Sequence, residues 1–124
     1  MKEITVEDVV ATLTQFDNCV ADIERKYGIA LPMEIKLILK EYEGQFVLVS
    51  TAEHCKILDL DEITNADHHL GLNCVQRMIV PLVDCKDNNF LFYNAIKYTY
   101  EMMNIVDCVS YGRYKSILDF FGSF

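Results

Sequence analysis

The longest regular pattern of apolar residues lies near the start of the chain and has the period of an α-helix. Its apolar positions recur at steps of three or four residues: Val6, Val9, Val10, Leu13, Phe16, Val20, Ile23 and Tyr27. Such spacing places side chains on one face of a helix. Thr5 can cap this helix, Asp8 can complete a capping box, and Gly28 ends the pattern. The pattern therefore predicts an amphipathic helix over residues 6–27.

A second amphipathic helix is predicted within residues 31–44, and its beginning is unusual. Its apolar face consists of Ile35, Ile38, Leu39 and Tyr42. Pro32 suits the first helical position because it has no N–H to leave unpaired, and Gly44 suits the residue just past the end. The capping position falls on Leu31, whose side chain cannot accept a hydrogen bond. We therefore expect Leu31 to be pressed into the core, with Glu34 reaching back to an unpaired N–H.

Beyond Gly44 the pattern changes to short segments rich in β-branched and aromatic residues, which predict strands. These segments are 45–50, 55–59, 77–83 and 89–94, followed by the first two-thirds of 97–107. Residues 85–89 predict a turn, because Asp and Asn tolerate a left-handed backbone. The strands on either side of this turn should therefore form a hairpin. Pro81 cannot donate to a ladder, which places it at a sheet edge, a bulge or a strand end.

Two short helices are predicted from their capping residues. Asp59 can cap one, with Glu62 at the third position, and Ser116 can cap another near the C-terminus, with Asp119 at the third position. Successive strands with helices at the ends of the chain are typical of an α+β fold with a mainly antiparallel sheet. The length fits one domain, residues 1–124.

Charge and cysteine content narrow the possible partners and compartments. The chain has 11 basic and 19 acidic residues, and its net charge of −8 disfavours nucleic acid and anionic membranes. The charge either serves only solubility or attracts a basic protein. Five scattered cysteines are typical of reduced, mostly buried thiols in a cytosolic protein. No apolar run resembles a signal peptide or a membrane span. We therefore expect a cytoplasmic protein.

Residues 67–74 are the strongest candidate for a metal site. The possible ligands are Asp67, His68 and His69, with His54, Cys55 and Cys74 as further donors. A metal needs three or four converging ligands, however, and adjacent histidines diverge on a helix or a strand. We therefore interpret the histidines as solvent-exposed loop residues, with a metal-binding protein or small hydrolase as the alternative.

A cysteine nucleophile is the other chemistry that the sequence suggests. Cys85 follows Asp84 directly, but no histidine lies in a sequence context that would activate its thiol. The glycines stand singly, so no phosphate-binding loop is present. These residues therefore predict no enzyme, no metal and no cofactor.

A series of landmarks along the chain resembles the SUKH superfamily, also called the Smi/Knr family. The first is the Leu-Pro helix beginning at residues 31–32, followed by Ile35, Ile38-Leu39 and Glu43-Gly44; the others are residues 57–63, residues 78–94, and Ser116, Ile117, Asp119 and Phe120. Each landmark is short, but they cover nearly the whole chain in the family's order. The chain departs from the family pattern at Gln45, where a second glycine is common, and it has no tryptophan.

The resemblance implies an α+β domain with a twisted, mainly antiparallel sheet flanked by N-terminal helices and a short C-terminal helix. Many bacterial members resemble immunity proteins that bind and neutralise a toxin, often a nuclease, whereas fungal members are regulators that act through partners. We therefore predict a SUKH-type immunity protein that occludes the basic active site of a cognate toxin. A regulatory or scaffold module without a toxin partner is the alternative. The first candidates for toxin contact are the acidic residues near strand ends and loops: Asp59, Asp61, Glu62, Asp84 and Asp87.

Overall fold

The N-terminal apolar pattern folds into the longest helix of the chain, α1, Val6–Tyr27. The structure is a computed structural model that describes residues 3–124. The predicted capping box is confirmed: the Asp8 N–H donates to the Thr5 hydroxyl at 3.1 Å, and the Thr5 N–H donates to the Asp8 carboxylate at 3.0 Å. At the other end Gly28 adopts a left-handed φ of 68° and stops the helix.

The second helix, α2, Met33–Tyr42, confirms the burial of Leu31 but corrects two details of its beginning. Pro32 is the capping residue, with an extended ψ of 151°, and helical geometry starts one residue later. Glu34 does not reach back along its own helix. Its carboxylate accepts the Ile117 N–H at 3.2 Å, while the Glu24 carboxylate accepts the Leu31 N–H at 2.7 Å. Long-range contacts thus replace the expected local cap.

All neighbouring strands pair antiparallel in chain order, which confirms the α+β fold and its antiparallel sheet. The strands are β1 Phe46–Ser50, β2 Glu53–Ile57, β3 Ile79–Asp84, β4 Asn89–Asn94, β5 Thr99–Asn104 and β6 Ser110–Tyr114. The first five match the predicted segments with shifts of one or two residues at their ends. The edge strand β6 was not predicted.

The hairpin of β3 and β4 forms the buried middle of the sheet. Its turn is confirmed, because Lys86, Asp87 and Asn88 all have positive φ angles. Pro81 lies inside β3 rather than at an edge, and the register shifts between Pro81 and Val83, so the bulge is the correct alternative. A bulge tolerates the missing N–H of proline because pairing is already interrupted there.

A helical insertion connects β2 to β3. It consists of α3 Leu60–Thr64, α4 Ala66–Leu70 and α5 Cys74–Arg77. Asp59 and Glu62 form the predicted capping box of α3, with hydrogen bonds of 2.7 and 3.1 Å. The expectation of a loop over residues 67–74 is wrong, because α4 and α5 occupy most of it. Both helices are too short to show a helical period in the sequence.

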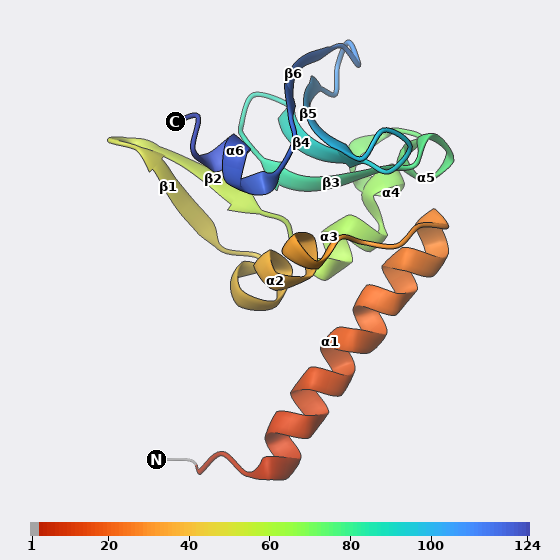
Figure 1. Ribbon diagram of the computed structural model, residues 1–124, viewed down its shortest axis with the longest axis vertical. Helices are drawn as coiled ribbons and strands as arrows, with labels where there is room; N and C mark the ends of the chain where they lie inside the picture. The colour runs from red at the N-terminus through yellow and green to blue at the C-terminus, as the bar shows by residue number, and fades with distance from the viewer. Residues whose placement is uncertain (1–2) are drawn as a thin grey trace.

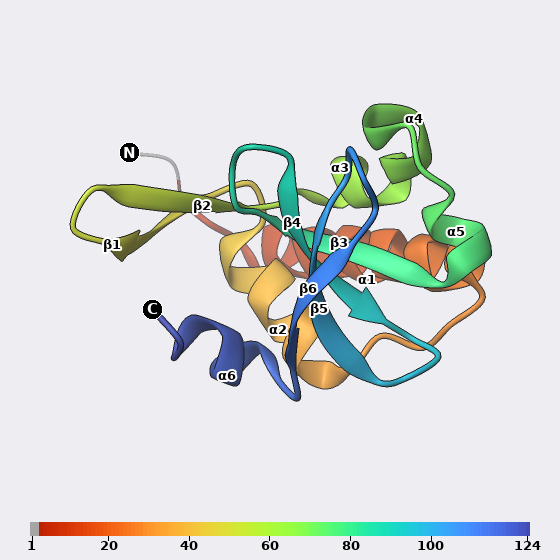
Figure 2. The ribbon, with the colours of Figure 1, turned by 90° about the horizontal axis from the view of Figure 1, so that it is seen from above.

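The helices surround the sheet unevenly. The C-terminal half of α1 packs against α3 and α5, whereas its N-terminal half extends away from the rest of the molecule (Figure 1). The last helix, α6, Ile117–Phe121, is capped by Ser116 as predicted and buries Ile117 and Phe120. It lies at the same end of the molecule as the projecting β1–β2 hairpin, which is part of the sheet (Figure 2). Within residues 3–124, no helix has the length and apolar character required to cross a membrane.

Candidate interaction surface

The N-terminal half of α1 presents an apolar stripe that no other described segment covers. Val20, Ile23 and Tyr27 of the stripe are buried, but every residue from 3 to 15 is exposed. The exposed apolar residues are Val6, Val9, Val10 and Leu13 of α1 and Ile4, which precedes the helix. The periodicity therefore predicts the helix correctly, yet only half of its apolar face contributes to the core. Folding of the described residues thus leaves this apolar face uncovered, which makes it a candidate interaction surface.

The stripe continues into a groove between α1 and α2 with a volume of about 340 Å³. Its walls are Thr12, Leu13, Gln15, Phe16 and Cys19 of α1, Lys40 and Glu41 of α2, and Glu43 and Leu60 beyond them. Glu43 also holds this region to the next element, because its carboxylate accepts the Leu60 N–H at 2.9 Å. The α1–α2 groove thus connects the exposed stripe to the start of α3.

Three of the five acidic residues predicted to contact a partner lie around Lys56 of β2. The Lys56 ammonium is 2.8 Å from the Glu62 carboxylate, and Asp84 lies opposite Lys56 in the β2–β3 ladder. Asp59 is joined to Glu62 by the capping box of α3. The hydrogen bond to Glu62 raises the pKa of Lys56, and the nearby charges of Asp59 and Asp84 act in the same direction. We call these residues (Lys56, Asp59, Glu62 and Asp84) the Lys56 cluster.

The other two acidic residues lie outside this cluster. One Asp61 oxygen accepts a hydrogen bond from the Asn65 amide at 3.0 Å, and the other is 3.9 Å from His69 Nε2. Asp87 lies at the exposed tip of the β3–β4 turn. The Lys56 cluster directly adjoins the α1–α2 groove, because Leu60 of the groove follows Asp59 in α3. The surface therefore combines an apolar stripe with an acidic end.

The residues of the alternative metal site are separated by the folding of α4 and α5. His68 and His69 are exposed, as expected, but they lie on α4. Asp67 turns away from solvent, because its carboxylate accepts the N–H groups of Cys74 and Val75 at the start of α5. Among the described residues, no group of three or more His, Cys, Asp or Glu side chains is arranged to hold a metal ion.

The pKa of the Cys85 thiol is shifted upward, whereas an activated cysteine nucleophile has a lowered pKa. Burial raises the pKa of Cys85, and the neighbouring Cys55 thiol and Asp84 carboxylate raise it further. A catalytic cysteine needs a lowered pKa, because the thiolate is the nucleophile. The absence of catalytic activity nevertheless stays a prediction, since no observation tests it directly.

One buried polar group was missed by sequence reasoning. Glu101 of β5 is only 8% exposed, and its carboxylate accepts hydrogen bonds from Asn94 and Ser110. In the sequence it is one acidic residue inside an ambiguous segment, and only the strand register brings its partners to it. Glu101 lies on the sheet, away from the surface described above.

Comparison with known proteins provides no relative from which a role could be transferred. No family model matches the chain, and searches of curated proteins and of solved structures find no significant match. The resemblance to the SUKH superfamily therefore stays a prediction, which rests on the landmarks in the sequence. What the structure contributes is the exposed apolar stripe of α1, the α1–α2 groove and the acidic Lys56 cluster, which adjoin one another.

Proposed function

We propose that this protein binds a basic partner protein through the α1 stripe, the α1–α2 groove and the Lys56 cluster. The observation that carries the proposal is the exposed apolar half of α1. Burying one valine or leucine side chain contributes about 1.5–3 kcal/mol. Ile4, Val6 and Val10 are 79%, 79% and 56% exposed, while Val9 and Leu13 are 48% and 39% exposed. Folding of this chain therefore leaves part of this driving force unused.

The charge around the stripe favours a basic partner over a second copy of the chain. No lysine or arginine occurs between residues 3 and 24, whereas Glu7, Asp8 and Asp17 lie along α1. Pairing two such helices would bring like charges together, which costs free energy across an interface. A partner with apolar side chains surrounded by Lys and Arg would instead complement both the stripe and its acidic flanks.

We further propose that this partner is a toxin, which the protein neutralises by covering its active site. The resemblance to immunity proteins of the SUKH superfamily supports this identification. A toxin that acts on nucleic acid needs basic residues to hold phosphates. An acidic surface with an apolar anchor can occupy such a site and exclude the substrate, without any catalytic residue of its own.

The proposal is tested by co-expression with the toxin encoded by the neighbouring gene and by calorimetry with the purified toxin domain. Wild-type protein should protect the cells and bind the toxin with an affinity that falls as salt increases. The double variant Val6→Lys/Val10→Lys should lose binding at least tenfold, because it replaces apolar anchors with charges that repel a basic partner. Because both substituted residues are exposed, the double variant should fold like wild type, which circular dichroism would verify.

A matched control is available elsewhere on the chain. Val106 and Val109 are 76% and 57% exposed, close to the 79% and 56% of Val6 and Val10, and they lie in and after the β5–β6 turn. Val106→Lys/Val109→Lys should therefore bind like wild type. Equal losses in both double variants would refute the proposed surface. Absence of both protection and binding would refute the toxin partner, and the regulatory alternative would then be tested by capture of host proteins.

A further inference from the structure

Two cysteines meet at the shortest ladder of the sheet. Strands β2 and β3 pair only at Lys56↔Asp84 and Ile57↔Val83, and one step further the same register places Cys55 opposite Cys85. Opposed residues in an antiparallel ladder alternate between hydrogen-bonded and non-hydrogen-bonded pairs. The Leu58 N–H donates to the Leu82 carbonyl at 2.9 Å, so the cysteines fall at a non-hydrogen-bonded position.

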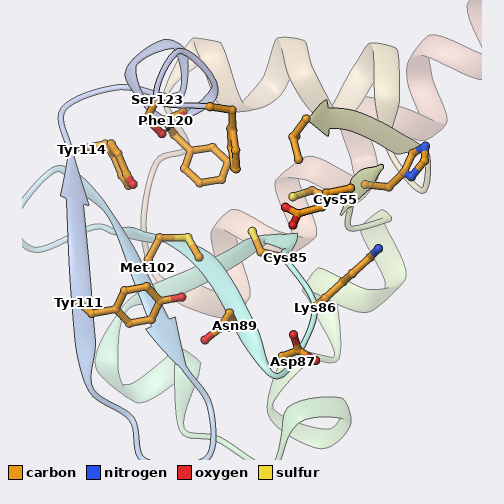
Figure 3. A pocket seen from close by; sticks show the side chains of 14 residues that line it. Cys55, Cys85, Lys86, Asp87, Asn89, Met102, Tyr111, Tyr114, Phe120 and Ser123 are labelled. Carbon is orange, nitrogen blue, oxygen red and sulfur yellow. Dashed lines mark hydrogen bonds between the residues drawn. The ribbon is translucent and has the colours of Figure 1, made fainter. Parts of the chain in front are cut away.

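This position suits a covalent bond between the two side chains. Cα atoms of a non-hydrogen-bonded pair are about 4.5 Å apart. That separation lies inside the range of about 4.4–6.8 Å found for disulfides. The Cys85 thiol donates to the Val83 carbonyl of β3 at 3.9 Å, and the side chains of Cys55 and Cys85 point toward the same space in the structure (Figure 3). Neither strand would need to move far for the sulfur atoms to bond.

The thiols line a cavity of about 440 Å³ between the β1–β2 hairpin, the β3–β4 turn, β6 and α6. Aromatic side chains of Tyr111, Tyr114 and Phe120 form one wall, and the opposite side includes the ammonium of Lys86 and the carboxylate of Asp87 (Figure 3). The carboxylate of Glu53 also lines the cavity. The volume lies within the range of about 300–1,000 Å³ that is typical of small-molecule sites. Cys85 is half-buried and Cys55 is 4% exposed, so a small molecule in the cavity reaches Cys85 first.

We propose that Cys55 and Cys85 form a reversible disulfide site, which is oxidised by a small disulfide of the glutathione type that enters this cavity. The Cys85 thiolate attacks one sulfur of the small disulfide, which forms a mixed disulfide and releases one small thiol. The Cys55 thiolate then attacks the Cys85 sulfur, which forms the Cys55–Cys85 bond and releases the second small thiol. Two protein thiols are oxidised, one small disulfide is reduced, and the two protein protons end on the released thiols.

The surroundings make this exchange slow and its product stabilising. Burial raises the pKa of both thiols; at Cys55 the carboxylates of Glu53 and Asp84 raise it further, and Lys86 opposes them. The thiolate is therefore scarce at neutral pH, and reaction takes place on a slow timescale. The disulfide would join the β1–β2 hairpin to β3 where the ladder is shortest, and it would restrict the unfolded chain between residues 55 and 85.

The test uses the full-length protein in buffers with increasing ratios of oxidised to reduced glutathione, followed by alkylation and mass spectrometry of peptides. Wild type should show one linked peptide pair containing Cys55 and Cys85, two hydrogen atoms lighter than the two free peptides together, and should melt at a higher temperature than the reduced protein. Cys55→Ser should stop at a glutathione adduct on Cys85, because the resolving thiol is missing. The exposed Cys108 serves as the matched position, so Cys108→Ser should oxidise like wild type.

Two results would overturn the proposal, and neither depends on the partner proposed above. One is a wild-type protein whose Cys55 and Cys85 both remain open to alkylation after denaturation, even in the most oxidising buffer. The other is a linked peptide that joins a different pair of cysteines. Both are read from the wild-type protein, so they hold even if a cysteine variant folds poorly.

Discussion

Replacing Glu101 with glutamine tests whether the buried carboxylate of β5 stabilises the fold as a charged group. One carboxylate oxygen accepts hydrogen bonds from the Asn94 amide at 2.7 Å and from the Thr99 hydroxyl at 3.4 Å. The other accepts from the Ser110 hydroxyl at 3.1 Å and lies 3.6 Å from the Arg113 guanidinium. The substitution Glu101→Gln keeps the shape of the side chain, removes its charge and puts an NH2 donor in place of one oxygen, where the Ser110 hydroxyl can accept a hydrogen bond from it.

The size of the expected loss in unfolding free energy follows from the two short hydrogen bonds. A hydrogen bond to a charged group contributes about 1.5–3 kcal/mol and a neutral one about 0.5–1.5 kcal/mol. Neutralising Glu101 should therefore cost about 1 kcal/mol at each of Asn94 and Ser110. The ion pair adds little, because Arg113 is 58% exposed and an exposed pair contributes about 0–1 kcal/mol. We expect a loss of about 2 kcal/mol, or roughly 8 °C in Tm for a chain of this length.

The pH dependence of the unfolding free energy shows independently that the charge of Glu101 stabilises the fold. Burial by itself would raise the pKa of Glu101, but the hydrogen bonds from Asn94 and Ser110 and the charge of Arg113 outweigh burial and hold that pKa below its usual value of 4.5. A carboxyl whose pKa is lowered by folding contributes stability above its unfolded pKa. That contribution is lost as the pH falls through the pKa of the folded protein.

The assay is urea denaturation of wild type and Glu101→Gln at pH 7 and again at roughly pH 2.5, below the ordinary range of a carboxyl pKa. The difference in unfolding free energy should be largest at pH 7 and should shrink in acid as the wild-type carboxylate takes up a proton. Glu53→Gln, an exposed carboxylate on β2, should stay close to wild type at both pH values. A variant as stable as wild type at pH 7, or an equal deficit at both pH values, would refute the argument.

Two further substitutions test the beginning and the end of α2. Leu31→Asp removes a side chain that is 5% exposed and places a carboxylate near that of Glu24. Thermal denaturation should therefore show a loss of unfolding free energy above about 3 kcal/mol. The control Leu31→Met should lose less than about 1.5 kcal/mol. An unchanged Tm for Leu31→Asp would contradict the burial of this position. Gly44→Ala should lower the unfolding free energy by about 1–2 kcal/mol in the same assay, because Gly44 has a left-handed φ of 74°. A change below about 0.3 kcal/mol would show that the left-handed turn is not required.

Much of the fold could be predicted because its signals are local. Thr5 with Asp8, Asp59 with Glu62, and Ser116 each sit next to the N–H groups that they cap, so a few residues contain the whole signal. Strand segments of alternating or continuous apolar character likewise need no knowledge of their neighbours. The order of these segments was then sufficient to predict an antiparallel α+β fold.

The features that could not be predicted from the sequence all depend on contacts that form only in the folded chain. Glu34 accepts a hydrogen bond from Ile117, which lies far away in the sequence, so the local cap expected of it is not needed. The α5 helix begins where Asp67 accepts backbone N–H groups. Strand β6 is exposed and contains Gly112, and it forms because β5 offers it an edge to pair with.

Of the candidate surface, the sequence indicated only acidic residues near strand ends, and it indicated neither their arrangement nor the exposed stripe of α1. Acidic residues near strand ends can be found in the sequence, but only the β2–β3 register shows that Asp84 shares Lys56 with Asp59 and Glu62. The same register brings Cys55 to Cys85. Periodicity showed which face of α1 is apolar, but it does not show how far the rest of the chain extends along that face.

The unpacked half of α1 still keeps its helical form, and this bears on how it would bind. An isolated helix of this length is marginal in water, because the first turn is costly to form. Here the helix is continuous with a half anchored by Val20, Ile23 and Tyr27, and the Thr5–Asp8 capping box closes its free end. A partner would therefore meet a preformed apolar face and would not have to order it on binding, which lowers the entropic cost of association. Because Val6 and Val10 take no part in the core, lysine at these positions should weaken binding without unfolding the protein, whereas lysine at Ile23 should do both.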